Sequence, residues 1–217
     1  MRNYIVAAAI VLLVSCLLCP VSQADSFEVT ITTTPIQGQS GFAVFDFIQG
    51  APVLNNTVTV SGFTSNALLG AFTRTGAVSG ALVPGPMTLS DSAFLSEFSQ
   101  GLTYGTTMSF ILTLTTNTSL GGIPDEFSFF LEDSAGNPFL TSDPTGADSL
   151  FAIDITGSPL DPFVFTSNFA TATVTPLTPV PEPSAVGLTS SSLVILALML
   201  GYFKSSRVAA RQLRHTP

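Results

Sequence analysis

Residues 25–180 of this chain contain no histidine, lysine, cysteine or tryptophan. The chain's single histidine is His215, and its two cysteines are Cys16 and Cys19. The long middle segment therefore cannot form a Ser-His-Asp or Cys-His nucleophile system, or a lysine Schiff base. It also lacks the nitrogen and sulfur ligands that zinc, copper and iron prefer. We expect a protein that is not an enzyme and needs no cofactor.

Positive charge is almost absent from the same segment. Of the 14 acidic residues in the chain, all except Glu182 lie between Asp25 and Asp161, where Arg74 is the only base. The resulting net charge of about −12 repels nucleic acid and anionic lipid headgroups. We therefore expect no nucleic-acid partner, and solubility alone accounts for the acidity.

A pair of carboxylates is the catalytic design that this composition still permits. Glycosidases hold two carboxyl groups about 5 to 10 Å apart. Glu126 and Glu132 fall on one face of a predicted strand, but six residues of strand separate them by roughly 20 Å. These two cannot act together, whereas carboxylates on different strands could still meet.

Oxygen ligands of the kind that calcium prefers gather in one loop region. The EF-hand pattern is not met there, because Ala135 and Pro138 stand where a ligand and the glycine belong. We therefore assign no metal site and name only weak calcium candidates, which are Asp133, Asn137, Asp143 and Asp148.

The first 24 residues have the three parts of a signal peptide. Arg2 precedes an uncharged apolar stretch that ends at Cys19, and a more polar stretch follows. The small residues Ser22 and Ala24 fit a signal peptidase site, with cleavage between Ala24 and Asp25. Residues 25–175 would then form an exported domain.

A second interpretation of the N-terminus remains open. Leu13-Val14-Ser15-Cys16 resembles a lipoprotein box, in which Cys16 carries a lipid, although the apolar run continues past this cysteine. With ordinary cleavage, both cysteines are removed and the mature chain has none. Its domain of about 150 residues must then be stabilised by its core and not by disulfides.

The C-terminal region is typical of a membrane anchor. Val186 to Phe203 carries no charge, and its 18 residues would form a helix roughly 27 Å long, which is enough to span a bilayer. The tail 204–217 has no acid, so it is predicted to be cytoplasmic and the preceding domain extracytoplasmic. The basic cluster that sets this topology is Lys204, Arg207, Arg211 and Arg214.

A proline-rich linker, residues 176–185, precedes the spanning segment. Its prolines favour an extended polyproline II conformation with an exposed backbone, which can enter a protease cleft without unfolding the domain. Glu182 lies between Pro181 and Pro183 and offers one charge in a narrow range of positions.

The order of these parts resembles the PEP-CTERM sorting signal of Gram-negative bacteria: Pro181-Glu182-Pro183, a spanning helix, and a basic cluster at the chain end. The resemblance implies export through the inner membrane, recognition by a membrane-embedded exosortase, removal of the tail, and release or attachment at the cell surface. It also implies bacteria that make exopolysaccharide and biofilm matrix. The 14 residues after Phe203 form a longer tail than is usual. The alternative is a single-pass membrane protein in which the motif is only a linker.

Between the ends, apolar and polar residues alternate with a period of two, which predicts strands with one buried face. Turn residues such as Pro84-Gly85-Pro86 separate them, and the best helical stripe, Asp91 to Phe98, is short. We expect an all-β domain, specifically a two-sheet sandwich of jelly-roll type, with a barrel as the main alternative. All phenylalanines except Phe203 lie in this domain and are expected in its core. The predicted strands are 27–32, 42–48, 57–63, 108–114, 126–132, 151–156, 163–166 and 169–175.

Segments such as GFAVFDF, MSFILTL and PDEFSFFLEDSAGNP also resemble an uncharacterised ectodomain that recurs with PEP-CTERM tails, and no activity is implied by it. We expect a structural role at the cell surface or in the matrix. The alternative is a lectin-like module that binds exopolysaccharide, because jelly rolls often hold sugars. Sugar platforms usually need aromatic side chains with a polar handle, and Tyr104 is the domain's only tyrosine.

Overall fold

The computed structural model of this chain describes residues 24–177, in which the strands confirm the all-β prediction. A single turn of 3-10 helix, Thr34–Ile36, follows the first strand. No helix within residues 24–177 combines the length and apolar character that a membrane crossing requires. The strands are β1 (Ala24–Thr32), β2 (Ser40–Ile48), β3 (Thr57–Ser65), β4 (Leu68–Thr75), β5 (Val78–Gly80), β6 (Met87–Ser90), β7 (Leu95–Thr103), β8 (Thr107–Thr115), β9 (Glu126–Asp133), β10 (Phe151–Asp154), β11 (Phe163–Val164) and β12 (Thr171–Pro176).

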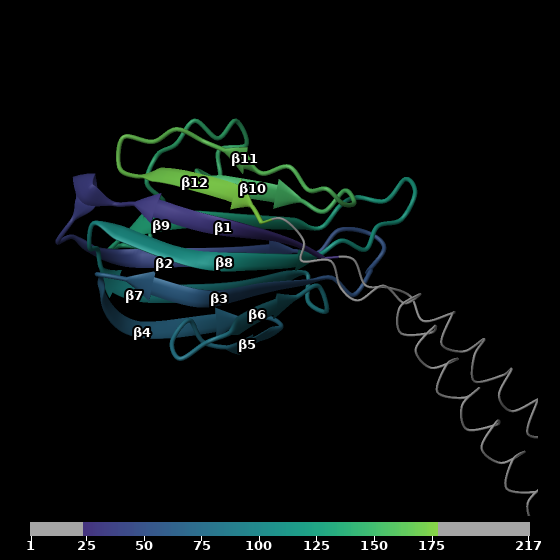
Figure 1. The fold of residues 1–217 in the computed structure, drawn as a ribbon, viewed down its shortest axis with the longest axis horizontal. Helices are drawn as coiled ribbons and strands as arrows, with labels where there is room; N and C mark the ends of the chain where they lie inside the picture. Colours follow the sequence, from purple (N-terminus) through teal and green to yellow (C-terminus); the bar gives the residue numbers. More distant parts are fainter. Residues whose placement is uncertain (1–23, 178–217) are drawn as a thin grey trace, which may run out of the picture. The chain divides into compact units, whose positions relative to one another are not determined.

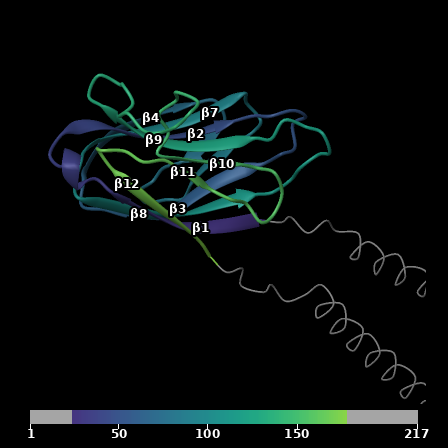
Figure 2. The ribbon, with the colours of Figure 1, turned by 90° about the horizontal axis from the view of Figure 1, so that it is seen from above.

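Two six-stranded sheets pack face to face (Figures 1 and 2), so the expected sandwich is confirmed. Sheet A has the order β12-β1-β8-β3-β6-β5, and sheet B has the order β11-β10-β9-β2-β7-β4. All pairings are antiparallel, and the pairs β1 with β8, β2 with β7 and β3 with β6 are nested in the sequence. Each sheet therefore joins strands that are far apart along the chain.

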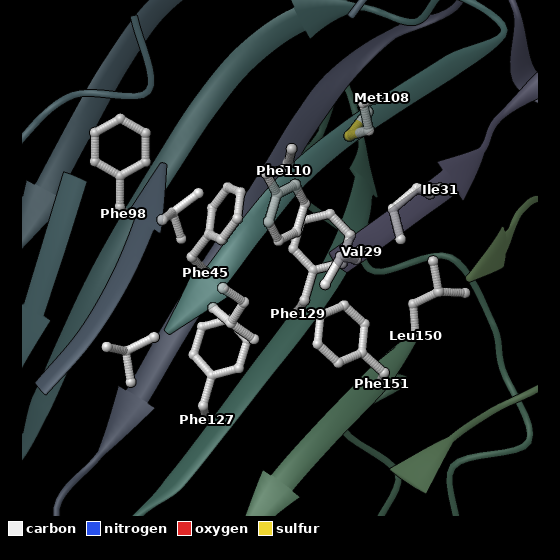
Figure 3. Close-up of a cluster of buried hydrophobic side chains, with 14 of the residues drawn as sticks. Val29, Ile31, Phe45, Phe98, Met108, Phe110, Phe127, Phe129, Leu150 and Phe151 are labelled. Atoms are coloured by element: carbon white, nitrogen blue, oxygen red, sulfur yellow. The ribbon is translucent and has the colours of Figure 1, made fainter. Parts of the chain in front are cut away.

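The core between the sheets is built largely from phenylalanine (Figure 3). Phe45 on β2 lies at its centre, with its ring centroid 4.9 Å from Phe129 and 5.5 Å from Phe110. Both pairs are edge-to-face, the geometry that the ring quadrupole favours. The predicted phenylalanine core is thus confirmed for these residues, whereas Phe94 (73% exposed) and Phe163 (52% exposed) lie outside it.

The sequence analysis missed the strands between residues 68 and 103. On β7 the inward positions include Ser96 and Gln100 as well as Phe98 and Leu102, so polar side chains interrupt the apolar alternation. Both buried side chains make hydrogen bonds to backbone carbonyls: Ser96 donates to the Ser90 carbonyl at 2.7 Å, and Gln100 to the Gly70 carbonyl at 2.9 Å. Half of the short stripe at 91–98, residues 95–98, belongs to β7 and is extended.

Truncating Phe45 should test the central position of its ring. For Phe45→Ala in the fragment 24–177, which contains the complete core, we expect a loss of about 3 to 5 kcal/mol in the free energy of unfolding. The exposed Phe94→Ala is the matched control and should change stability by less than about 0.5 kcal/mol. Chemical denaturation measures both, and equal effects would contradict the packing described here.

Candidate functional site

Most of the sorting features predicted from sequence lie outside the described residues. These are residues 1–23 of the signal peptide, the tripeptide Pro181, Glu182 and Pro183, the spanning segment 186–203, and the basic cluster of Lys204, Arg207, Arg211 and Arg214. The linker is described only for its first two residues. The described part of the chain is the domain that these features are predicted to sort.

The predicted signal peptidase bond, between Ala24 and Asp25, falls at the start of β1. Asp25 accepts hydrogen bonds from the Ser158 hydroxyl at 2.8 Å and the Leu160 amide at 2.7 Å. The carboxylate thereby fixes the loop after β10 to the first strand. The residue predicted to become the new N-terminus thus has a structural role in the folded domain.

Both ends of the described chain emerge at the same end of sheet A. β12 pairs with β1 in antiparallel register, with Phe27 opposite Pro176. β12 is the edge strand of this sheet, and four residues separate its last residue from the predicted sorting tripeptide. A cut near Glu182 would therefore remove no strand residue and no core residue.

The outer face of sheet B carries a row of carboxylates. Asp46 on β2 lies directly opposite Glu97 on β7 and Ser128 on β9. Further acids occupy outward positions on the same sheet, namely Glu126, Glu132 and Asp154. Sequence reasoning missed this grouping, because strands distant in sequence bring the carboxylates together.

Asp46 is the most perturbed of these acids. Burial of its carboxyl group, followed by the negative charges of Glu97 and Glu132, raises the pKa of Asp46 to about 7. Its Oδ1 atom is buried without a hydrogen-bond partner. Because residues directly opposite in an antiparallel pair have Cα atoms about 5 Å apart, the negative charge of Glu97 lies close enough to disfavour ionisation of Asp46.

Glu126 and Glu132, which were predicted to lie too far apart to act together, are both on β9. Both side chains point to the outer face of sheet B, opposite Ile48 and Phe42 of β2. Burial raises the pKa of each carboxyl group, and nearby acids add to the effect. They remain six residues apart on one extended strand, whereas the pairs Asp46 with Glu97 and Glu126 with Asp154 lie directly opposite each other on neighbouring strands.

The weak calcium candidates mainly bond to their own loops. Asp133 accepts from the Ala135 and Asn137 amides at 2.8 and 2.9 Å, which lowers the pKa of its carboxyl group. Asp143 accepts from the Thr145 amide, and Asp148 from the Thr141 amide, both at 2.9 Å. Within residues 24–177, no three acidic side chains come together as a possible metal site.

Tyr104, considered as a polar aromatic for sugar binding, is buried in the structure (2% exposed). Its hydroxyl donates toward the carbonyls of Phe42 (2.7 Å) and Glu132 (2.8 Å), so it joins β2 to β9. Burial raises the pKa of this phenol well above its usual range. Tyr104 is therefore a structural residue and offers no platform to a ligand.

An open hollow of about 310 Å³ lies over the ends of β2, β4 and β7. Gly41, Gly70 and Gly101 contribute to its lining, and Phe42 and Leu68 are beside them. The Phe42 ring lies against Gly101, where an added Cβ would be 3.6 Å from it. The hollow is shallow and largely apolar, and no titratable side chain lines it.

A buried polar cluster, also missed from sequence, fixes the loops at the end where the described chain begins and ends. Asn56 is fully buried and donates to Asp125 Oδ2 at 2.7 Å, while its backbone amide donates to Asp91 Oδ2 at 2.9 Å. Asp125 also accepts from the Gly50 amide at 2.6 Å, and Asp91 from the Leu54 amide at 3.1 Å. Two carboxylates thus serve as internal acceptors for loop backbone and are not exposed.

The outer face of sheet A consists almost entirely of hydroxyl side chains, with Glu28 as its one carboxylate and Ile111 as its one large aliphatic side chain. Neighbouring strands share hydrogen bonds there, such as Ser26 with Thr113 at 2.9 Å. The sandwich therefore has a neutral face opposite its acidic one. The hydroxyl face is formed by Ser26, Thr30, Thr32, Thr57, Thr59, Ser61, Thr64, Ser79, Thr88, Ser90, Thr107, Ser109, Thr113, Thr115, Thr171, Thr173 and Thr175.

Comparison of the chain with family models, curated proteins and solved structures finds no match.

The pKa of Asp46 predicts how stability depends on pH. The folded domain binds this proton more tightly than the unfolded chain, whose carboxyl pKa is near 3.8. The stabilisation of the folded domain by protonated Asp46 is therefore complete below about pH 4 and is lost as pH rises through about 7. After allowance for partial exposure, we expect the free energy of unfolding to fall by about 1 to 2 kcal/mol between pH 5.5 and pH 8.5 because of this group.

Asp46→Asn should remove most of this slope and should stabilise the domain at the higher pH. Urea unfolding at several pH values measures the effect. Glu28→Gln, which removes the lone acid of the hydroxyl face, is the control and should retain the wild-type slope. An unchanged slope in Asp46→Asn would show that Asp46 does not hold the proton.

Proposed function

We propose that this chain is an exported protein, sorted and processed through a PEP-CTERM signal, whose β domain has a structural, non-catalytic role at the cell surface or in the extracellular matrix. In this proposal the precursor is anchored in the inner membrane with the domain in the periplasm. Signal peptidase acts first, an exosortase then removes the tail, and the domain becomes surface-bound or extracellular. No cofactor is required.

The position of β12 is the observation that best supports the proposal. Processing requires a segment that can be cut without damage to the folded domain. β12 ends at Pro176 on the edge of sheet A, and the sorting tripeptide begins four residues after Leu177. Cutting within or after the tripeptide leaves the paired strands and the phenylalanine core complete.

We further propose that the sandwich is a jelly roll. The nesting of β1 with β8, β2 with β7 and β3 with β6, in alternate sheets, supports this topology. The short β5 departs from an ideal jelly roll because it pairs with β6 in sheet A. β9, β10 and β11 would then be additions beside β2, and β12 an addition beside β1.

Replacing Glu182 tests the sorting function directly. In a host that contains an exosortase, the wild-type chain should lose its C-terminal residues, and Glu182→Ala should retain Pro217 and stay in the membrane fraction. Pro179→Ala lies outside the tripeptide and should be processed normally. Intact mass and cell fractionation provide the readout. Recovery of wild-type chains only in the uncut form would refute the proposed processing.

A second candidate function is contact with neutral exopolysaccharide, and the hydroxyl face of sheet A favours it. Hydroxyl groups donate and accept hydrogen bonds, as polysaccharide hydroxyls do, and the near absence of charge avoids a desolvation cost. The lack of an exposed aromatic platform on this face makes it the weaker candidate.

A binding assay with an immobilised neutral glucan tests the second candidate. We expect saturable binding of the domain, and Thr30→Lys on the hydroxyl face should weaken it at least about threefold through steric and desolvation effects. Thr73→Lys on the outer face of sheet B adds the same charge and should leave binding unchanged. Absence of binding by the wild type would eliminate this function.

A further inference from the structure

Large apolar side chains are exposed at the end of the sandwich where β1 begins and β12 ends. We call this region the terminal tip and define it as the loops 49–56, 91–94 and 116–125 (Figure 1). These side chains are Val53 (53% exposed), Phe94 (73%), Leu120 (106%) and Ile123 (69%).

The three loops of the tip are joined to one another. Ala51 and Ile123 exchange two backbone hydrogen bonds of 3.0 and 2.9 Å, and the Gln49 amide donates to the Phe94 carbonyl at 2.9 Å. Asp91, which follows β6, accepts from the Leu54 amide across the gap between loops. The apolar side chains are therefore carried on one connected surface.

The exposed surface of the tip has no charge. Its three loops contain two acids, Asp91 and Asp125, and each is 1% exposed because it accepts loop amides. Acids outside these loops lie at the same end of the sandwich: Asp25 near the start of β1 and Glu126 at the start of β9 are half-buried, and Asp161 in the loop after β10 is exposed. This surface contrasts with the outer face of sheet B and with the net charge of about −12 on the domain.

The sequence limits how far the tip can lie from a membrane. Eight residues separate Leu177 from Val186, where the predicted spanning segment begins. Fully extended, they cover at most about 30 Å. A tether of this length holds the tip near the bilayer and so raises the effective concentration of one for the other. Even a weak affinity between the tip and lipid then suffices to keep them in contact.

We propose that the terminal tip is a lipid-contacting surface that inserts its apolar side chains into the interface of an uncharged, zwitterionic bilayer while the chain is anchored. This inference rests on the proposed function, because the anchor supplies the tether. Apolar loop residues bind the interface by burying their side chains at the boundary between headgroups and acyl chains. The acidic domain favours zwitterionic over anionic headgroups. Removal of the tail then leaves only the weak contact, so cutting releases the domain.

Depth-dependent quenching in the full-length chain tests the inference. In a Cys16→Ser, Cys19→Ser background, Leu120→Cys is labelled with an environment-sensitive fluorophore, and the chain is reconstituted in phosphatidylcholine vesicles that contain spin-labelled lipid. The matched control is Leu140→Cys. Leu140 is 70% exposed and lies in the loop between β9 and β10, at the end of the sandwich opposite the tip. We expect at least a twofold greater quenching at position 120 than at position 140.

A second variant keeps the test independent of the labelled position. With the label at Ile123→Cys, the changes Val53→Ser, Phe94→Ser and Leu120→Ser should abolish the quenching while the thermal unfolding midpoint stays within a few degrees of the wild type. Equal quenching at positions 120 and 140, or none at either, would overturn the lipid contact. Quenching that requires added exosortase would also overturn it and would assign the tip to that enzyme.

Alkaline carbonate extraction distinguishes failure of the lipid contact from failure of the proposed sorting function. A chain that is extracted from the vesicles has no membrane anchor, which refutes the proposed sorting route and with it the tether. A chain that resists extraction but shows no quenching at position 120 keeps its anchor and refutes only the lipid contact.

Discussion

The register of antiparallel pairing is the constraint on which the rest of this structure depends. In an extended strand, alternate side chains face opposite sides of the sheet, so a slip of one residue would turn Phe45 outward and Asp46 into the core. Burial of the phenylalanine cluster prevents such a slip on β2, and β8 and β9 are fixed in the same way by Phe110 and Phe129. The hydrophobic core thereby sets the composition of both outer faces.

The two outer faces follow from this register and differ chemically. Threonine and serine alternate with the buried residues of sheet A, so its exterior is neutral and rich in hydroxyl groups. On sheet B the alternate positions place Asp46 beside Glu97, and burial together with like charge raises the pKa of Asp46. Of the acids on the two outer faces, five therefore lie on sheet B, whereas Glu28 is the one acid on sheet A.

The same separation occurs at the loops. Asp91 and Asp125 would add charge to the terminal tip if they faced solvent, but they bond to loop amides in the interior. Their burial fixes three loops and leaves apolar side chains such as Leu120 outside. One set of hydrogen bonds thus joins the loops of the tip and keeps two acids off its surface, which favours the proposed lipid contact.

The sequence by itself determined the all-β class, the phenylalanine-rich core and most strands, because a period of two is a local property of the chain. It also supplied the order of the predicted sorting elements, which lie outside the described residues. It did not reveal β4 to β7, where polar groups such as Ser96 and Gln100 point inward. Only the tertiary structure decided that Asp46 lies opposite Glu97 and that Tyr104 is buried. It also decided that Asp91 and Asp125 accept hydrogen bonds from the amides of distant loops. Each of these contacts joins strands or loops whose proximity depends on the packing of the whole sandwich.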